Sequence, residues 1–293
     1  MLIHHNHVSE KPNRVVVIGG TGFLGKCIVA KLIDNSVDVL SLGSSEVNLL
    51  ESSSIEVLTK LLKSSDTLIF LSAITPDKGR DVDAFMNNIL MMKHLCASLK
   101  GIKVAHLIYL SSDAVYGQKQ SLLSEDSPAA PQDLYGAMHL TRELMLSELA
   151  DIPVASLRIT AVYGAGDTHT SYGPNRFLKS AHESQRIDLF GCGEELRDHI
   201  YCDDIAVITN LCAHKKSCGV LNIATGKSHT FNMVAKLVAD QFDEPIRIQK
   251  NKRSNLITHK HFDITNLLKA FPSLCLTDLE DGLKLYQVHK LEN

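Results

Sequence analysis

The chain of 293 residues is 44% hydrophobic and has a formal net charge of −3, so it can bury a large core in one extended α/β domain or in two lobes. The acidic balance, without a lysine or arginine cluster, argues against a nucleic-acid partner, and no apolar run approaches the ~20 residues that cross a membrane. The seven cysteines are odd in number and lack Cys-x-x-Cys spacing. With no signal-peptide pattern, this is typical of reduced thiols in a cytoplasmic protein without a metal site.

Strand and helix patterns alternate from Arg14 onward, after a leader of residues 1–13 that we expect to be flexible. Apolar runs predict strands at Arg14–Ile18, Val37–Leu42, Thr67–Ser72, Val104–Ser111, Val154–Arg158 and Val220–Ile223. Helical spacing predicts helices such as Gly25–Asp34, Ser54–Lys63, Asp83–Leu99 and Tyr135–Leu149. This order indicates an α/β fold, a doubly wound (Rossmann) parallel sheet with helices on both faces.

Two lobes are expected from the change in this rhythm. Residues 14–165 read as a dinucleotide-binding domain. Between Gly166 and Arg197 the chain turns into a stretch rich in glycine, proline and asparagine, which we expect to be irregular. Residues 166–293 therefore mainly form a smaller substrate-binding lobe, with segments at about 200–226 returning to the sheet.

The most informative stretch is the β-branched run Val15–Ile18 and the glycines that follow it. Gly19, Gly22 and Gly25 separate that strand from a helix, in the order that builds a pyrophosphate site at a helix N-terminus. Gly19 frees the backbone to turn, Gly22 lets it approach phosphates, and Gly25 lets the helix lie close to the strand. Because glycines also mark ordinary turns, the flanking strand and helix carry the prediction of nucleotide binding.

Seven motifs in this order resemble the extended short-chain dehydrogenase/reductase family, in its nucleotide-sugar epimerase, dehydratase and 4-ketoreductase group. They are Gly-Gly-Thr-Gly-Phe-Leu-Gly (19–25), Ser-Ser-Asp-Ala-Val-Tyr-Gly (111–117), Tyr-Gly-Ala-Met-His (135–139), Leu-Arg-Ile-Thr-Ala-Val-Tyr-Gly (157–164), Pro-Asn-Arg-Phe (174–177), Arg-Asp-His-Ile-Tyr-Cys-Asp-Asp (197–204) and Asn-Ile-Ala-Thr-Gly (222–226). The resemblance runs from about Arg14 to about Tyr286 and implies an NAD(P)-dependent enzyme acting on a nucleotide-diphospho-sugar.

The resemblance also implies catalytic roles. Such enzymes move hydride between a nicotinamide and a sugar carbon while a tyrosine moves the proton on the adjoining oxygen. Tyr135 matches that tyrosine, and Ser112 matches the hydroxyl that hydrogen-bonds the same sugar oxygen, although Ser112 alone fits a strand-end cap equally well. Four residues after Tyr135, on the same helix face, the family has lysine and this chain has His139.

His139 leads to the prediction about the reaction. Histidine is largely uncharged at pH 7, so it supplies less positive charge to stabilise a tyrosinate. A protonated tyrosine suits reduction of a keto-sugar, which we favour, whereas 4-epimerisation is the alternative because it must first oxidise a hydroxyl. Ala114 replaces the acid of the family's dehydratases, which argues against dehydration. A second alternative is a catalytically weakened NADP(H)-binding sensor or scaffold protein.

The resemblance further implies a set of cofactor contacts. They are Gly19, Thr21, Gly22, Phe23, Leu24, Gly25, Ser44, Ser45, Asn48, Leu49, Ala73, Tyr135 and His139. NAD enzymes usually have an acid at the end of the second strand, where this chain has Ser44 and Ser45 and no acid before Glu46. This favours NADP over NAD, without an arginine to hold the 2′-phosphate. A helix cap is the other interpretation of Asn48.

For the substrate, Arg197 resembles the arginine that pairs with the diphosphate, and a surface ion pair with Asp198 is the alternative. Asn175 and Arg176 lie in the matching sugar-nucleotide loop, and Thr75 and Asp113 complete the expected substrate contacts. Methionine and leucine stripes on the helices at 83–99 and 135–149 predict a homodimer, unless they simply face the sheet.

Overall fold

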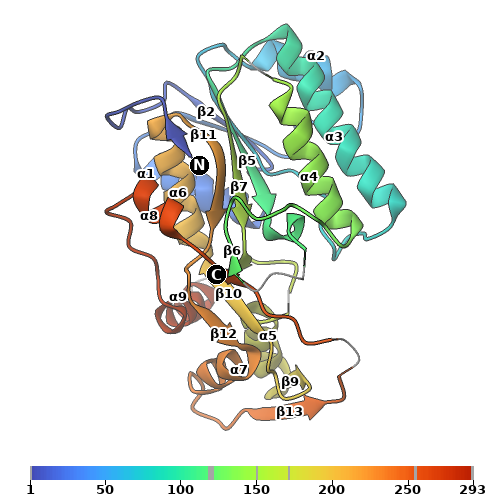
Figure 1. The fold of residues 1–293 in the computed structure, drawn as a ribbon, viewed down its shortest axis with the longest axis vertical. Helices are drawn as coiled ribbons and strands as arrows, with labels where there is room; N and C mark the ends of the chain where they lie inside the picture. Colours follow the sequence, from blue (N-terminus) through green and yellow to red (C-terminus); the bar gives the residue numbers. More distant parts are fainter. Residues whose placement is uncertain (1, 118–121, 150, 171, 254–255, 292–293) are drawn as a thin grey trace.

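The fold is built around a seven-stranded sheet (Figure 1). The computed structural model describes residues 2–117, 122–149, 151–170, 172–253 and 256–291. In spatial order the strands are β1 (Ile3–His4), β11 (Ser217–Ile223), β7 (Val154–Ile159), β5 (His106–Ser112), β4 (Thr67–Phe70), β2 (Val15–Ile18) and β3 (Val39–Leu42). All neighbouring pairs are parallel except β1 with β11. The predicted doubly wound parallel sheet is confirmed.

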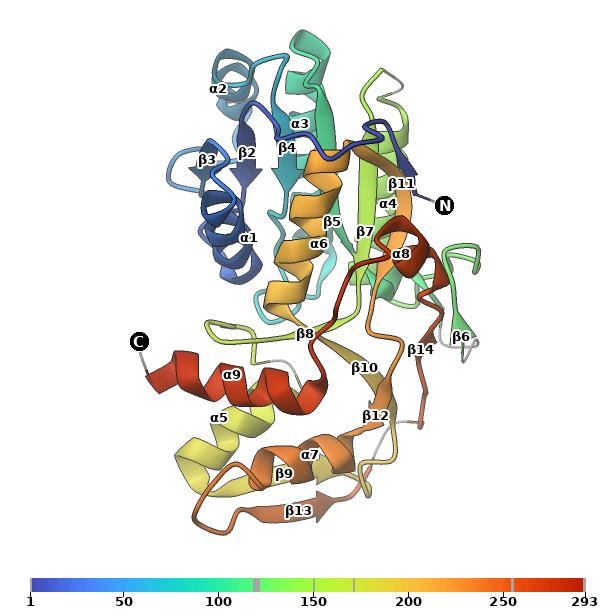
Figure 2. The ribbon, with the colours of Figure 1, turned by 90° about the vertical axis from the view of Figure 1, so that its left-hand side faces the viewer.

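Helices cover both faces of this sheet (Figures 1 and 2). One face carries α2 (Ser53–Leu61), α3 (Val82–Gly101) and α4 (Leu134–Ser147), and the other carries α1 (Phe23–Asp34) and α6 (Cys202–Lys215). Strand β2 shows why both faces are needed. Val15 and Val17 join the core under α1 and α6, whereas Val16 and Ile18 join the core under α2 and α3, so every side chain of β2 is buried.

The first residues differ from the flexible leader that the sequence suggested. Ile3 and His4 form β1, paired antiparallel with Cys218 and Ser217 at the sheet edge. His4 is held on both sides of its ring, by Ser217 Oγ at 2.8 Å and the Ala270 carbonyl at 3.0 Å. A dipeptide is too short to show hydrophobic periodicity, so this strand depends on tertiary hydrogen bonds that the sequence pattern does not display.

The second lobe lies beyond the carboxyl ends of the strands (Figure 2). Its elements are β8 (Ala161–Tyr163), α5 (Pro174–Ser184), β9 (Arg186–Phe190), β10 (Leu196–Tyr201), β12 (Ser228–Thr230), α7 (Phe231–Ala239), β13 (Arg247–Asn251) and α9 (Leu279–Leu291). Most of these elements contribute side chains to one apolar core, among them Phe177, Leu189, Val234 and Leu283. The stretch 166–197, expected to be irregular, thus contains α5 and β9. Gly173, at φ 127°, and Pro174 at the first helical position set the start of α5.

Short elements connect the lobes. The 3₁₀-helix η1 (Asp113–Val115) follows β5, and β6 (Leu122–Leu123) pairs in parallel with β14 (His261–Phe262) from the C-terminal part of the chain. Helix α8 (Thr265–Ala270) then packs against β11. Among the described residues, no helix combines the length and the apolar composition needed to cross a membrane.

Candidate active site

The glycine turn between β2 and α1 is tightly packed on its inner side and open on its outer side. Gly19 has φ 92°, and a Cβ added at Gly25 would lie 2.2 Å from the Gly19 carbonyl oxygen, so neither position tolerates a side chain without a shift. Gly22 is exposed, and it precedes the first turn of α1 as an N-cap without a side-chain hydrogen bond. The first turn of α1 contains no acidic residue, so its free N–H groups fit a phosphate group of a dinucleotide.

The end of β3 has an acidic side chain that the sequence interpretation placed too far away. Ser44 and Ser45 lie in a turn in which the Val47 N–H donates to the Gly43 carbonyl. This turn brings Glu46 back, so that its carboxylate accepts hydrogen bonds from the Gly43 N–H at 2.8 Å and Ser45 Oγ at 2.8 Å. These bonds lower the pKa of Glu46, with the Ser45 bond as the larger cause. The tight turn over residues 43–47 was the available signal.

Asn48 and Leu49 are engaged by the protein itself. Asn48 Oδ1 accepts from the Leu50 N–H at 3.2 Å, and its amide donates to Glu51 at 2.8 Å. This geometry is a local turn stabilised by the Asn48 side chain, and the N-cap of α2 is Ser52, so the alternative interpretation of Asn48 as a helix cap is wrong. Leu49 is buried, and its carbonyl lies 2.8 Å from His94 Nδ1, so the segment is fixed against α3.

Helix α4 places Tyr135 beside the end of β5. Asp133 caps the helix by accepting from the Gly136 N–H at 2.8 Å. A Cβ at Gly136 would lie 2.1 Å from the Ala114 carbonyl oxygen, so only glycine allows the first turn of α4 to contact η1 this closely. Ser112 Oγ accepts from the Ala114 N–H at 3.1 Å. Ser112 therefore caps η1, and its hydroxyl hydrogen remains available to a ligand oxygen.

Tyr135 is partly buried, and burial raises its pKa to about 12. The carboxylates of Asp113, Asp133 and Asp77 act in the same direction. Arg142, two helical turns further along α4, acts in the opposite direction. The phenol is therefore protonated at neutral pH.

His139 lies directly behind Tyr135. The two rings meet edge to face with centroids 4.7 Å apart. His139 is 3% exposed, its Nδ1 lies 2.7 Å from the Tyr109 hydroxyl, and its Nε2 has no hydrogen-bond partner among the described residues. Burial, with the Arg142 charge as the second cause, lowers its pKa to about 3. This histidine is neutral at physiological pH.

The segment after β4 is held by α3 and by the second lobe. Asn88 binds both the N–H and the carbonyl of Ile74, at 2.9 and 3.0 Å, and so fixes the backbone next to Ala73. Thr75 Oγ1 lies 3.3 Å from His169 Nδ1, and the same nitrogen lies 2.8 Å from Asp77. Thr75 therefore lies where the segment after β4 meets the chain around His169.

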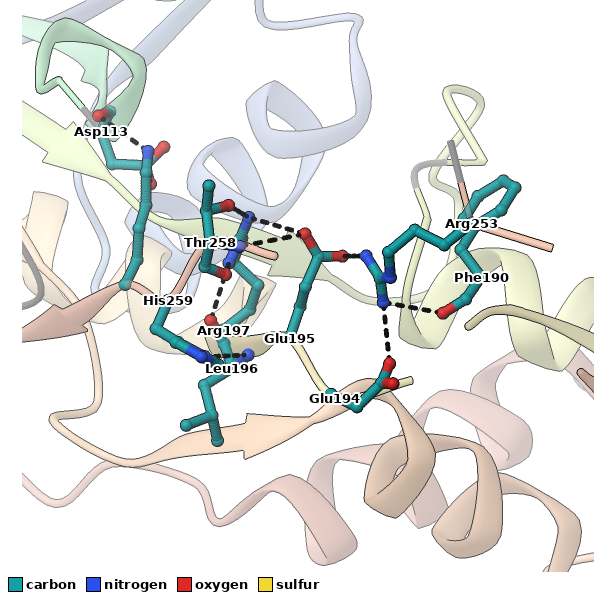
Figure 3. A network of polar contacts seen from close by, with 10 residues as sticks. Asp113, Phe190, Glu194, Glu195, Leu196, Arg197, Arg253, Thr258 and His259 are labelled. Carbon is teal, nitrogen blue, oxygen red and sulfur yellow. Dashed lines mark hydrogen bonds and ion pairs between the residues drawn. The ribbon is translucent and has the colours of Figure 1, made fainter. Parts of the chain in front are cut away.

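Charged residues gather around β10 and the segment that follows β13 (Figure 3). Arg197 on β10 donates to the Thr258 carbonyl at 2.6 Å and to Thr258 Oγ1 at 2.8 Å, and its guanidinium lies 3.9 Å from Glu195. Burial lowers the pKa of Arg197, while Glu195 and Asp113 act in the opposite direction. The alternative partner, Asp198, is fully buried and points elsewhere: it accepts hydrogen bonds from Thr225 and Gly226.

Two further cations at this surface were missed by the sequence interpretation. Arg253 pairs with Glu194 at 3.0 Å and Glu195 at 3.1 Å (Figure 3). Lys260 pairs with Asp113 at 3.0 Å. Both come from the segment after β13, which has no periodicity, although the pair Lys252-Arg253 was a weak signal. Arg197 and Arg253 thus share Glu195 as a partner, and Lys260 pairs with Asp113. We call Arg197, Arg253 and Lys260 the network cations.

Asn175 and Arg176 contact other residues than the network cations do. Asn175 is buried and accepts from the Gly164 N–H at 3.1 Å, while its amide donates to Val162 and Asp167. These contacts are all structural. Arg176 is exposed, with its guanidinium 6.0 Å from the Tyr172 ring centroid.

A parallel sheet whose first long strand leads through a glycine turn into an uncapped helix defines the class of dinucleotide-binding α/β proteins. Within this class, the model of the NAD dependent epimerase/dehydratase family matches residues 15–224, and the chain belongs to that family. The match contains the strands of the main sheet from β2 to β11 and the second-lobe elements up to β10.

Known relatives extend the similarity over nearly the whole chain. An ADP-L-glycero-D-manno-heptose-6-epimerase of Alkalilimnicola ehrlichii is 26% identical over 93% of this chain and 96% of that protein. A trifunctional UDP-glucose 4,6-dehydratase, 3,5-epimerase and UDP-4-keto-L-rhamnose-reductase of Arabidopsis thaliana is 26% identical over 94% of this chain and 46% of that protein. The structure of a UDP-glucose 4-epimerase from Thermus thermophilus, in complex with NAD, has the same fold, with a TM-score of 0.79 and 21% identity over 94% of this chain and 98% of that chain. The expectation of an enzyme of the nucleotide-sugar group is confirmed.

Proposed function

We propose that this protein reduces a nucleotide-linked keto-sugar with Tyr135 as the proton donor. The observation that carries the proposal is the protonated phenol of Tyr135 beside the buried, neutral His139. A reductase needs a proton at the position of the developing sugar oxyanion, and a tyrosine with a pKa of about 12 retains it at neutral pH. An oxidising step would need the same oxygen as a base.

The chemistry divides between the dinucleotide and the protein. The dinucleotide, when bound, supplies the hydride that forms the new carbon–hydrogen bond. The carbonyl π electrons move to the sugar oxygen, which takes the phenol proton of Tyr135 and leaves a phenolate. Ser112 donates a hydrogen bond to the same sugar oxygen, because its oxygen is already engaged as the cap of η1.

The cofactor site favours NAD(H) over NADP(H), contrary to the preference expected from the two serines. The glycine turn and the N-terminus of α1 would hold the pyrophosphate. Glu46 places a carboxylate at the end of β3, and an added Cβ at Gly43 would touch both this carboxylate and Thr21. A carboxylate there accepts hydrogen bonds from ribose hydroxyls and repels a 2′-phosphate.

The network cations carry the positive charge that would bind the diphosphate of the substrate. They are partly buried, with side chains 15 to 22% exposed, and their present partners are the protein's own carboxylates and carbonyls. A diphosphate would replace Glu195 as the partner of Arg197 and Arg253 in a charge-assisted, bidentate arrangement. The base and the sugar are open within the class of nucleoside diphosphate sugars.

A second candidate is 4-epimerisation, favoured by the epimerase activities named for two of the relatives described above. It differs from reduction in a measurable way, because an epimerase returns its cofactor to the starting redox state and a reductase consumes it. The third candidate is the catalytically weakened sensor or scaffold protein, which would bind the dinucleotide but not nucleoside diphosphates.

The test pairs each reduced cofactor with a keto-sugar, and NAD⁺ with a sugar that only an epimerase would convert. Purified protein is incubated with NADH or NADPH and UDP-, dTDP- or GDP-linked 4-keto-sugars, and separately with NAD⁺ and UDP-glucose. We expect loss of NADH that depends on a keto-sugar, abolished in Tyr135→Phe and retained in Tyr286→Phe, a tyrosine in the core of the second lobe. Epimerised sugar without net NADH loss would replace reduction by the second candidate. Thermal stabilisation by a dinucleotide but by no nucleoside diphosphate would indicate the sensor.

A further inference from the structure

Arg142 is a fully buried cation on the inner face of α4. It is 0% exposed and follows His139 by three residues and Tyr135 by seven, which places all three on one side of the helix. Its guanidinium donates to the Asn88 carbonyl at 2.6 and 3.0 Å, to Asn88 Oδ1 at 3.0 Å and to the Ser72 carbonyl at 2.9 Å. It also lies 5.2 Å from the centroid of the Phe70 ring.

These partners are all neutral. Among the residues that the structure describes, no carboxylate lies within ion-pair distance of Arg142. The neighbouring residue on α4 shows the usual arrangement, because Glu143 forms a buried ion pair with Arg158 at 2.7 Å. The same helix therefore neutralises one buried arginine and leaves the other with its full positive charge.

An unpaired buried charge is costly, and arginine does not relieve the cost by losing its proton. In a poorly polarisable interior, such a charge acts strongly on nearby ionisable groups. The group with chemistry to perform there is Tyr135, since Tyr109 and His139 are buried and hydrogen-bonded to each other. The neutral His139 leaves the space behind Tyr135 without a charge of its own.

We propose that Arg142 is a positioning residue whose unpaired charge stabilises the phenolate that Tyr135 becomes after it gives up its proton. This inference rests on the proposed function of Tyr135. In this inference the positive charge near Tyr135 comes from Arg142, seven residues further along α4. The residue four positions after Tyr135, His139, does not supply it. Because Arg142 is fully buried, this role acts only through Tyr135.

Other charges face Tyr135 and must be held constant in any test. Asp113 is paired with Lys260, Asp77 with His169, and Asp133 with the N-terminus of α4. All three carboxylates raise the pKa of Tyr135, and Arg142 is the cation that opposes them. Substitutions at positions 142 and 88 leave these three pairs intact.

The test measures the ionisation of Tyr135 directly and needs no substrate. Tyr135 is replaced by 3,5-difluorotyrosine, whose phenol ionises within the pH range of folded proteins, and its ¹⁹F resonance is followed against pH. We expect Arg142→Gln to raise the pKa by about one unit or more, a tenfold or greater loss of phenolate at a given pH, and Arg142→Lys to restore most of it.

A second variant covers the case in which Arg142→Gln does not fold. Asn88→Asp supplies the missing carboxylate at the atom that already accepts from Arg142 at 3.0 Å, so it neutralises the charge with almost no change of shape. We expect it to raise the pKa of the labelled phenol as well. Asn88→Ser is its matched control, since it loses the amide bond to Ile74 without adding charge.

An unchanged pKa in folded Arg142→Gln, or equal effects of Asn88→Asp and Asn88→Ser, would overturn the proposal. This outcome is separate from failure of the proposed function, which would appear as turnover retained by Tyr135→Phe. If Tyr135 is catalytic, the pH–rate profile of Arg142→Gln shifts in parallel with the pKa of the labelled phenol. A loss of turnover at all pH values without such a shift would indicate a merely structural arginine and reject the inference.

Discussion

Protonation of His139 is expected to destabilise the folded protein as the pH falls. Its pKa is about 3 in the folded state against an ordinary value of 6.5, because burial disfavours the charged ring. The unfolded chain therefore binds a proton below pH 6.5 that the folded chain does not bind until about pH 3. The stabilisation from neutral His139 is complete above pH 6.5 and is lost progressively between these two values.

The magnitude follows from this window. A pH of 5 lies about 1.5 units below the ordinary pKa of histidine, and each of these units costs about 1.4 kcal/mol of stability. The free energy of unfolding therefore falls by about 2 kcal/mol relative to pH 7. This is a substantial part of the roughly 5–15 kcal/mol typical of a folded protein.

The assay is urea unfolding of wild type and His139→Gln at pH 7 and pH 5. Glutamine cannot titrate and can still hydrogen-bond the Tyr109 hydroxyl, which lies 2.7 Å from His139 Nδ1. We expect the loss between the two pH values to be about 2 kcal/mol smaller in the variant, whatever its stability at pH 7. The exposed His7→Gln serves as control. Equal losses in wild type and His139→Gln would refute a neutral buried His139, and with it the basis for a protonated Tyr135 in the proposed reaction.

Four further predictions concern ligands and assembly. Arg197→Ala should weaken binding of a nucleoside diphosphate by about 2 kcal/mol, with dinucleotide affinity unchanged by calorimetry, and equal losses of both would indicate a structural arginine. Glu46→Ser should shift the ratio of NADPH to NADH affinities toward NADPH, because it removes a negative charge next to the expected 2′ position. Gly25→Ala should abolish dinucleotide-induced thermal stabilisation, since its Cβ would meet the Gly19 carbonyl at 2.2 Å, and unaltered stabilisation would contradict this packing. The predicted homodimer should appear in sedimentation and be lost in Leu144→Glu, because Leu144 is 61% exposed on α4, whereas a monomeric wild type would leave the stripes with a role inside the fold only.

The main sheet could be predicted because each of its strands shows its pattern within a short stretch of the sequence. Runs such as Val15–Ile18 are continuous and apolar, and the helices between them bury residues at helical spacing, so each element is visible within its own window. Strand β1 and helix α5 were not predicted. The pairing of Ile3 with Cys218 joins residues far apart in the sequence, and α5 lies within a stretch of turn-forming residues.

The candidate site was predicted in part for the same reason. Motif positions such as Gly25 and Tyr135 stand in contiguous segments, whereas Arg253 and Lys260 reach Glu195 and Asp113 from a segment with no recognisable pattern. Arg142 was hidden for another reason. An arginine on an amphipathic helix is usually solvated, and only the packing of α3 against α4 shows that this one is enclosed.

The antiparallel pairing of β1 with β11 has a consequence for how the protein is made. Strand β1 can join the sheet only after residue 218 has been synthesised, because Ile3 and His4 pair with Cys218 and Ser217. Until then the nascent chain carries an N-terminal segment without its partner, and β7 lacks its neighbour β11. Closing loops of this length is slow, and an open strand edge attracts other chains during that time. The dependence of this protein on dilution or on chaperones is therefore expected to be greatest before residues 217–223 have been synthesised, when the other strands of the main sheet are present but β7 still has an unpaired edge.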